Sequence, residues 1–373
     1  MKVPFHASWI TNHDKKAVLK ALNNRWLTNG PILESFENQF SRYIGTPYSI
    51  GVSSATHALH LSLHAIDIGP SDEVIVPTIT FASTADVVMY RGAKPVICDV
   101  ESDTFNITAE SIKRKITKKT KAVIVVHYGG QSCDMDEIEK LCRDNQLYII
   151  EDCAHSLGSQ YKDRICGTMG ITGCFSFYPT KIITTGEGGM IVTKNKKIAT
   201  RVRSLRSHGM NIIPRKREEQ RKWEYDIVEM GYNYRLDEIR ASLGISQLKR
   251  VNQINDRRIK IAKKFSRELN KIKGITIPVQ KKDRNHIFHL YTIKVEKNYP
   301  LTRDELFLKL ASKGIGASVQ YMPLHLMTYI KNKFNFRKDD FPMANKVKNQ
   351  ILSLPIFPSM TSKQVDYVVN SIR

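Results

Sequence analysis

The chain has 373 residues, of which 41% are hydrophobic and 25% are charged, and these proportions are typical of a globular protein with a packed core. A chain of this length buries enough apolar surface to fold without disulfides, and we expect one large and one smaller domain. The 58 Lys and Arg residues outnumber the 36 Asp and Glu residues by 22, and this surplus attracts nucleic acid, a membrane surface or a phosphorylated small molecule without selecting among them.

The sequence contains neither a secretory signal nor a membrane-spanning segment. The first 22 residues lack an apolar core of signal-peptide length, and no later apolar run approaches the ~20 residues that a membrane span requires. The six cysteines form no C-x-x-C pair, which argues against a zinc site or a redox dithiol and predicts buried, reduced thiols. We therefore expect a cytoplasmic protein with no bound metal and no membrane partner.

Two amphipathic helices are predicted at the start of the chain. Apolar residues recur at helical spacing over residues 13–23 and 32–43, and the turn-forming residues 26–31 (WLTNGP) separate the two segments.

From residue 48 short apolar runs alternate with helical segments. The predicted strands are 48–52, 73–76, 95–98, 122–126 and 148–151, and helices are predicted at 81–90 and 136–143. This alternation is typical of a parallel sheet covered by helices on both faces. Ligands of such sheets gather at the carboxyl ends of the strands.

Residues 53–56 (SSAT) follow the first predicted strand and open a helix. Small residues and hydroxyls at a helix N-terminus leave backbone N–H groups free, and with the helix dipole these groups can hold a phosphate. Ordinary serine capping explains the same residues. Taken alone, the motif favours a helix cap.

The strand predicted at 148–151 is continued by residues 152–156 (DCAHS). Asp152 lies where the strand finishes, so its carboxylate can point into a site at the edge of the sheet. Paired with a pyridine nitrogen, this carboxylate would keep the nitrogen protonated. A helix cap is the alternative for Asp152, because small residues follow it. His155 is a structural histidine unless Asp152 already has a partner.

Lys181 is the single cation between Ile171 and Thr193. An apolar run ends at a Pro-Thr pair just before Lys181, and a glycine-rich segment after it leads into a second apolar run. Burial disfavours the ammonium form of a lysine, and a neutral amine can condense with an aldehyde. These are the requirements of a Schiff-base lysine. The alternative is a surface lysine on a loop between two strands.

The second half of the chain carries no motif of its own. A basic helix is predicted at 198–206, a charged segment runs to residue 221, and residues 230–237 (MGYNYRLD) precede a helix that ends near residue 248. A long helix from 251 to 272 leads into short elements, such as 290–295, 304–313 and 364–372. We predict a large domain over residues 1–250 and a small α+β domain over 251–373.

The chain resembles the fold type I pyridoxal-phosphate enzymes, and within them the nucleotide-sugar aminotransferases of the DegT family. The resemblance covers nearly the full length and rests on the order and spacing of residues 26–31, 53–56, 151–155, 175–189, 206–209, 231–235 and 354–358. It implies an α/β fold with a mostly parallel seven-stranded sheet between helices and a smaller α+β C-terminal domain.

The resemblance also implies roles for single residues toward pyridoxal 5'-phosphate (PLP). Lys181 would bond to the cofactor aldehyde, Asp152 would pair with the ring nitrogen, and His155 would approach the ring hydroxyl. Phe81 would stack on the ring. The implied phosphate-binding residues are Ser54, Ala55, Thr56 and Ser176, with Asn233 supplied by the partner subunit. A homodimer with shared active sites is therefore expected.

The implied reaction moves an amino group from L-glutamate to a nucleotide-linked keto-sugar. Family members that remove a sugar hydroxyl carry His where this chain has Lys181, so transamination is expected. Residues 126–130 (VHYGG) are similar to a loop of the members that aminate C4, which favours a 4-keto-6-deoxyhexose on UDP, dTDP or GDP, and C3 amination stays open. The predicted substrate contacts are Thr28, Arg206, His208 and Tyr321.

Two alternatives remain open from the sequence. The net charge suggests a non-enzymatic regulatory protein that binds nucleic acid on the same fold, but no recognition helix with interleaved aromatic or amide side chains stands out. We therefore expect no nucleic-acid partner. A different PLP reaction, such as decarboxylation or racemisation, is the second alternative.

Overall fold

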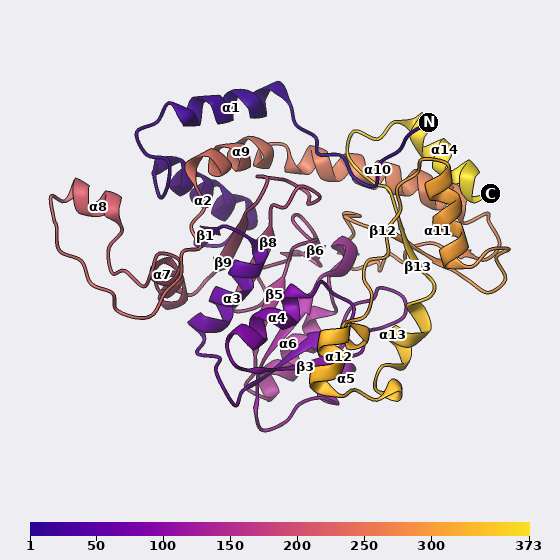
Figure 1. Cartoon of the computed structure of the whole chain (residues 1–373), viewed down its shortest axis with the longest axis horizontal. Coiled ribbons are helices and arrows are strands. Elements are labelled where there is room, and N and C mark those ends of the chain that lie inside the picture. Colours follow the sequence, from indigo (N-terminus) through magenta and orange to yellow (C-terminus); the bar gives the residue numbers. More distant parts are fainter.

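A seven-stranded sheet forms the centre of the molecule in the computed structural model, which describes residues 1–373 apart from the side chains of Pro214 and Lys338 (Figure 1). Its spatial order is β1-β9-β8-β5-β4-β2-β3. The strands are β1 (Tyr48–Val52), β2 (Glu73–Pro77), β3 (Lys94–Cys98), β4 (Thr120–Val126), β5 (Tyr148–Asp152), β8 (Thr172–Ser176) and β9 (Gly189–Thr193).

Within this sheet β9 runs antiparallel to both of its neighbours, and the remaining pairs are parallel. The strands are rich in Val and Ile because helices cover both faces and leave no solvated side. The α/β fold with a mostly parallel seven-stranded sheet is thus confirmed.

Helices connect the strands and surround the sheet. The N-terminal helices are α1 (Asn12–Leu22) and α2 (Pro31–Ile44), and the helices among the strands are α3 (Ala55–Ala65), α4 (Ser83–Tyr90), α5 (Ala109–Lys113), α6 (Met135–Asp144), α7 (Lys196–Leu205) and α9 (Glu238–Leu248). Side chains cap several of them at the N-terminus; Asn195, for example, accepts from two backbone N–H groups of α7. Between β5 and β8 the chain forms a small separate sheet from β6 (Gln160–Tyr161), β7 (Arg164–Ile165) and the distant β11 (Arg284–Asn285).

The C-terminal part has its own sheet and its own apolar core. α10 (Val251–Leu269) leads to the sheet β10-β12-β13, formed by Ile275–Thr276, Tyr291–Val295 and Ile351–Leu354, and α11 (Arg303–Ser312) and α14 (Ser362–Ile372) pack nearby (Figure 1). Phe265, Ile293 and Leu306 belong to this core, which Val3 from the N-terminus joins. In contrast, Ile330 of α12 (Thr328–Phe334) and Ala344 of α13 (Pro342–Val347) join the core of the large sheet. The domain boundary at residue 250 stays a prediction.

The predicted element boundaries differ from the observed ones by a few residues. The helix predicted over 251–272 ends at Leu269, where turn hydrogen bonds such as Ile272 N to Leu269 O replace the helical pattern. The helix predicted from Phe81 begins at Ser83. Among the described residues, no helix combines the length and the apolar character that a bilayer crossing demands.

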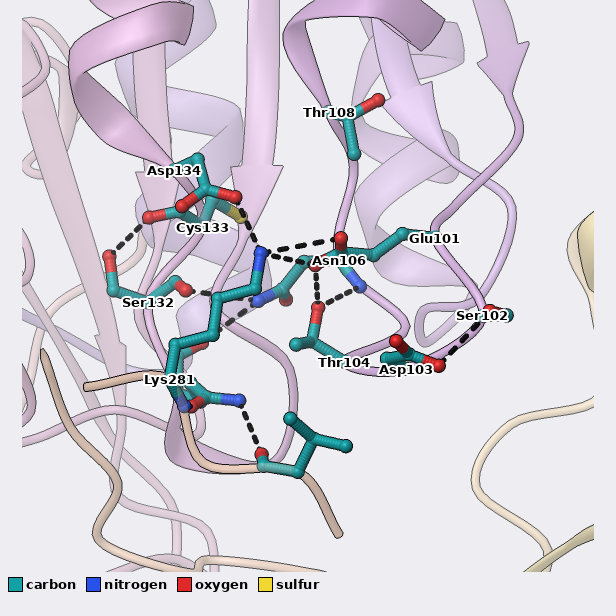
Figure 2. A network of polar contacts seen from close by, with 12 residues as sticks. Glu101, Ser102, Asp103, Thr104, Asn106, Thr108, Ser132, Cys133, Asp134 and Lys281 are labelled. Carbon is teal, nitrogen blue, oxygen red and sulfur yellow. Dashed lines mark hydrogen bonds and ion pairs between the residues drawn. The ribbon is translucent and has the colours of Figure 1, made fainter. Parts of the chain in front are cut away.

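A polar network fastens the C-terminal part to the loop that follows β4 (Figure 2). The Lys281 ammonium contacts Asp134 at 2.7 Å and Glu101 at 3.1 Å. The Asn106 side-chain amide donates to the carbonyls of Gln131 and Ser132 at 3.2 and 3.1 Å. These contacts fix residues 128–134, which lie directly after a strand end of the large sheet.

Residues 210–230 form an arm that extends away from the body and carries the short helix α8 (Pro214–Glu219) (Figure 1). Arg215 ties the arm to α2 through an ion pair with Glu34 at 2.7 Å. Apolar side chains are exposed along the arm, including Trp223 at 83% and Met230 at 75%.

The Glu238 carboxylate caps helix α2 from a distant position in the sequence. It is buried and accepts hydrogen bonds from the backbone N–H groups of Gly30, Ile32 and Leu33 at 2.7–3.0 Å. These donors are among the N–H groups that a helix N-terminus leaves without an internal partner. Gly30 is required there, because a Cβ at this position would lie 2.6 Å from Glu238 Oε2.

Replacing Glu238 by Gln is therefore expected to lower the free energy of unfolding by about 2 kcal/mol, because buried N–H groups lose a charged acceptor. Urea unfolding of the apoprotein, followed by circular dichroism, measures the change. Glu110→Gln is the matched control: its side chain is 75% exposed, and the loss should stay below ~0.5 kcal/mol. Equal losses in the two variants would contradict the assigned role of Glu238.

Candidate active site

The carboxyl ends of the parallel strands bring the predicted cofactor residues to one edge of the sheet. Asp152 is the last residue of β5 and Ser176 is the last residue of β8. Ser54 follows β1 and caps α3, where its side chain accepts the N–H of His57 at 3.1 Å. The edge at which open α/β sheets bind ligands therefore contains these three residues.

Asp152 presents a buried carboxylate without an ion-pair partner among the described residues. It is 6% exposed, one oxygen accepts the N–H of Ala154 at 3.1 Å, and the other accepts the hydroxyl of Thr84 at 3.2 Å. Burial raises the pKa of Asp152, and the positive charge of Lys181 opposes this effect. A cation placed beside the carboxylate would relieve the cost of its burial.

Lys181 lies in the turn between β8 and β9, where its backbone N–H donates to the Tyr178 carbonyl at 2.9 Å. Burial lowers the pKa of Lys181 to about 8, and the negative charge of Asp152 acts in the opposite direction. About a tenth of the Lys181 side chains are therefore neutral amines at pH 7, and the neutral amine is the nucleophilic form.

His155 completes the group from the same strand end. Burial, assisted by the charge of Lys181, lowers the pKa of His155 well below its usual value, so the imidazole is neutral. Its Nδ1 accepts the N–H of Gly129 at 3.4 Å, which leaves the proton on Nε2. Nε2 then donates to the Tyr321 hydroxyl at 3.0 Å, and the two rings are almost parallel.

The structure thus groups Asp152, His155 and Lys181 with Tyr321, which the sequence predicted only as a substrate contact. Phe81 is 61% exposed and lies 6.1 Å from the Tyr321 ring, so it borders the same group. The turn before α3 approaches β9 closely, because a Cβ on Gly189 would lie 2.5 Å from the Ser54 backbone. Ala55 and Thr56 form the first turn of α3, where backbone N–H groups are available to an anion.

The other predicted substrate residues form a second group. Thr28 precedes Asn29, whose side-chain amide donates to Ser207 at 3.4 Å, and Ser207 lies between Arg206 and His208. Arg206 is buried, and its Nη1 donates to Glu37 at 2.6 Å and to the Gly51 carbonyl at 2.7 Å. Arg206 Nε has no hydrogen-bond partner within the part of the chain that the structure describes.

A cavity of about 1150 Å³ adjoins this second group. It lies between α2, α7 and the arm, and Asn29, Arg206 and Met210 are among its lining residues. Seven basic and three acidic side chains line it. Asp152, His155 and Lys181 do not line it, so the structure separates this cavity from the Lys181 group of the same chain.

Asn233 is exposed, and its side-chain oxygen accepts a hydrogen bond from Arg235 at 2.9 Å. The segment that carries it is laid against the turn after β1, since Ser53 N donates to the Tyr234 carbonyl and the Tyr234 ring stacks on His57 at 3.6 Å. Asn233 thus lies near the turn after β1, the predicted phosphate site, but its side chain faces outward.

Sequence reasoning missed Thr84 and the contact between His155 and Tyr321. Thr84 lies in a helix that was predicted, but no pattern selects it over the neighbouring Ser83 as the partner of Asp152. His155 and Tyr321 are 166 residues apart, and no local signal in the sequence connects them.

A mostly parallel sheet with a lysine and a carboxylate near its carboxyl edge is shared with aminotransferases of fold type I. The model of the DegT/DnrJ/EryC1/StrS aminotransferase family matches residues 9–373. The chain belongs to this family and is an aminotransferase.

Two relatives match nearly the whole chain. The uncharacterized protein MJ1066 of Methanocaldococcus jannaschii is 43% identical over 358 residues, which cover 95% of this chain and 93% of the relative. The spore coat polysaccharide biosynthesis protein SpsC of Bacillus subtilis is 37% identical over 374 residues, with coverage of 100% and 96%.

Solved structures show the same fold. The PLP form of the putative sugar aminotransferase Spr1654 from Streptococcus pneumoniae superposes with a TM-score of 0.93 at 30% identity, with 100% of this chain and 98% of the other covered. PseC from Helicobacter pylori, an aminotransferase involved in the biosynthesis of pseudoaminic acid, gives a TM-score of 0.93 at 28% identity and the same coverage.

The cofactor is PLP, and the residues at the sheet edge fit it. The unpaired buried carboxylate of Asp152 suits a protonated ring nitrogen, and the partly neutral amine of Lys181 suits an aldehyde. The first turn of α3 suits the phosphate.

Acylation of the apoprotein is expected to label Lys181 with an apparent pKa of about 8, because only the neutral amine reacts. Mass spectrometry of the labelled peptides at a series of pH values measures the midpoint. Lys162 is the control within the same sample, since its contact with Asp136 raises its pKa. Asp152→Asn should move the Lys181 midpoint to lower pH, and an unchanged midpoint would contradict the coupling between the two residues.

Proposed function

We propose that this aminotransferase transfers the amino group of L-glutamate to a keto-sugar carried on UDP or dTDP, most simply a 4-keto-6-deoxyhexose. The product would be an amino-sugar nucleotide for a surface glycan or polysaccharide. The proximity of Lys181 to a buried, unpaired Asp152 supports the chemistry. The similarity to SpsC, Spr1654 and PseC supports a sugar as the acceptor.

Each side chain has a definite task in this reaction. When bound, PLP supplies an electron sink for the carbon that loses a proton. Asp152 would hold the protonated ring nitrogen, and the Ser54–Thr56 turn with Ser176 would hold the phosphate. Lys181, as a free amine, would move the proton between the donor's α carbon and C4′ of the cofactor. His155 stays neutral and holds Tyr321 in place through its Nε2–H.

The basic cavity beside Arg206 supports a nucleotide-linked acceptor. Its volume of about 1150 Å³ accommodates a sugar nucleotide, and a diphosphate would meet an excess of positive charge. Arg206 lines the cavity, and Thr28 and His208 are the other two predicted contacts near it in the chain. Tyr321 belongs to the other group, beside His155.

Because Lys181 of the same chain does not line this cavity, we infer that the sugar reaches Lys181 of a partner subunit. A homodimer would cover the exposed apolar residues of the arm and would place Asn233 in the partner's phosphate site. Nucleotide sugars are cytoplasmic metabolites, so we propose that the protein is located in the cytoplasm. C3 amination is the alternative outcome.

Incubation with L-glutamate and a UDP- or dTDP-linked 4-keto-6-deoxyhexose is expected to release 2-oxoglutarate in proportion to the amino-sugar nucleotide formed. Coupled detection of 2-oxoglutarate measures the rate, and NMR of the product distinguishes C4 from C3 amination. Lys181→Ala should abolish turnover, whereas Lys162→Ala should not change it. Loss of carbon dioxide or a racemised amino acid without 2-oxoglutarate would refute transamination.

Shared active sites predict complementation between two inactive variants. In a mixed dimer of Lys181→Ala and Asn233→Ala subunits, one site combines an intact Lys181 with an intact Asn233. Random assembly should therefore recover about a quarter of the wild-type rate. Each variant alone serves as the control. Recovery no greater than the sum of the two would show that Asn233 does not act across an interface.

A further inference from the structure

Directly behind Asp152 lies a buried polar cluster to which the mechanism above gives no task. It contains His127, Glu151 and Cys153, whose ligand-type atoms all lie within 4.8 Å of one another. The Glu151 carboxylate accepts hydrogen bonds from His127 Nε2 at 2.9 Å and from the backbone N–H groups of Gly167, Met169 and Gly170 at 2.6–2.7 Å. Its oxygens are thus already committed to protein donors.

These donors keep Glu151 ionised. Burial alone would raise its pKa, but the hydrogen bond from His127 Nε2 and the N–H groups of Gly170 and Gly167 lower the pKa of Glu151. The N–H of Cys133 donates to His127 Nδ1 at 3.2 Å, so the proton on Nε2 points at Glu151. Both His127 and Glu151 have no exposed surface.

The cluster contacts the end of β5 on the face of the sheet opposite to the Asp152 side chain. Glu151 and Asp152 are consecutive strand residues, so their side chains point to opposite faces of the sheet. The backbone N–H of His127 donates to the Asp152 carbonyl at 3.3 Å. His127 therefore contacts the backbone of Asp152 and the side chain of Glu151 at the same time.

Two loops are fixed by the same contacts. The Gly167–Gly170 loop is held by the Glu151 carboxylate and packs tightly on β8, since a Cβ on Gly173 would lie 2.4 Å from Gly167 Cα. The loop from Tyr128 to Cys133 is held by Asn106, which accepts the N–H of Tyr128 at 2.9 Å and donates to the Ser132 carbonyl (Figure 2). The end of β5 is thus clamped between two anchored loops.

We propose that Glu151 and His127 are positioning residues that set the orientation of the Asp152 carboxylate at the ring nitrogen of PLP. The carboxylate keeps that nitrogen protonated only when it is aligned with it. The sheet pairs Asp152 with Val126 and Cys174, and the contacts of Glu151 and His127 add to this pairing. Without the contacts of Glu151 and His127, the end of β5 would shift and the proton affinity of the ring nitrogen would fall. This role is independent of the sugar and of the amino donor.

The decisive experiment is ¹⁵N NMR of PLP labelled at the ring nitrogen and bound to the protein, recorded over a series of pH values. Wild-type protein is expected to hold the protonated ring. Asp152→Asn gives the reference ¹⁵N signal for a ring nitrogen that has no carboxylate beside it. Glu151→Gln should move the signal toward the Asp152→Asn value and weaken PLP binding roughly tenfold, as the loss of a charge-assisted contact does.

Glu238→Gln is the matched control, because it too removes a buried carboxylate that receives three backbone N–H groups, but at the start of α2. It should lower the unfolding midpoint as Glu151→Gln does and keep the wild-type ¹⁵N signal. If Glu151→Gln does not fold, the same measurement is made on His127→Gln. This variant still offers an amide donor to Glu151, but it no longer places an acceptor at the N–H of Cys133. A folded variant with the wild-type signal and titration, or a shift of equal size in Glu238→Gln, overturns the proposal.

Discussion

The site depends on two groups that prefer water and are largely removed from it, the carboxylate of Asp152 and the amine of Lys181. Burial raises the pKa of Asp152 and lowers that of Lys181, so each group is driven toward its neutral form, while their mutual attraction opposes both shifts. The balance leaves the amine reactive near neutral pH and leaves the carboxylate without a cation of its own. A protonated heterocycle would satisfy the carboxylate, so the two side chains fit PLP.

Buried carboxylates elsewhere in the molecule hold backbone in place. Glu238 receives three N–H groups at the start of α2, and Glu151 receives three at the loop beside β5. A carboxylate accepts several donors at once, so one side chain can fix a loop that regular hydrogen-bond ladders leave free. Asp152 differs from both because it accepts only two hydrogen bonds and faces the ligand edge. The carboxylate with unused acceptor capacity is the one at the ligand edge of the sheet.

The net charge of +22 is not spread as unpaired cations around the basic cavity. Arg206 pairs with Glu37, Arg215 with Glu34 and Arg201 with Glu229, so these three lining arginines already have carboxylate partners. What remains for a ligand is a surplus of positive charge, because seven basic and three acidic side chains line the cavity. This favours a phosphorylated small molecule in a shaped cavity over a long polyanion on an open basic surface.

The sequence alone determined the mostly parallel sheet, through alternating apolar runs. It also singled out Asp152, through its place at a strand end, and Lys181, as the one cation of an apolar stretch. These features are local: hydrophobic period, turn residues and one cation in an apolar stretch are all visible within a few residues of each other. Only the tertiary structure decided that Tyr321 lies against His155, that Glu238 caps α2, and that Arg206 belongs to a cavity apart from Lys181. The physical reason is that each of these contacts joins segments far apart in the chain, and burial, which sets the pKa of Lys181 and Asp152, is a property of the assembled core.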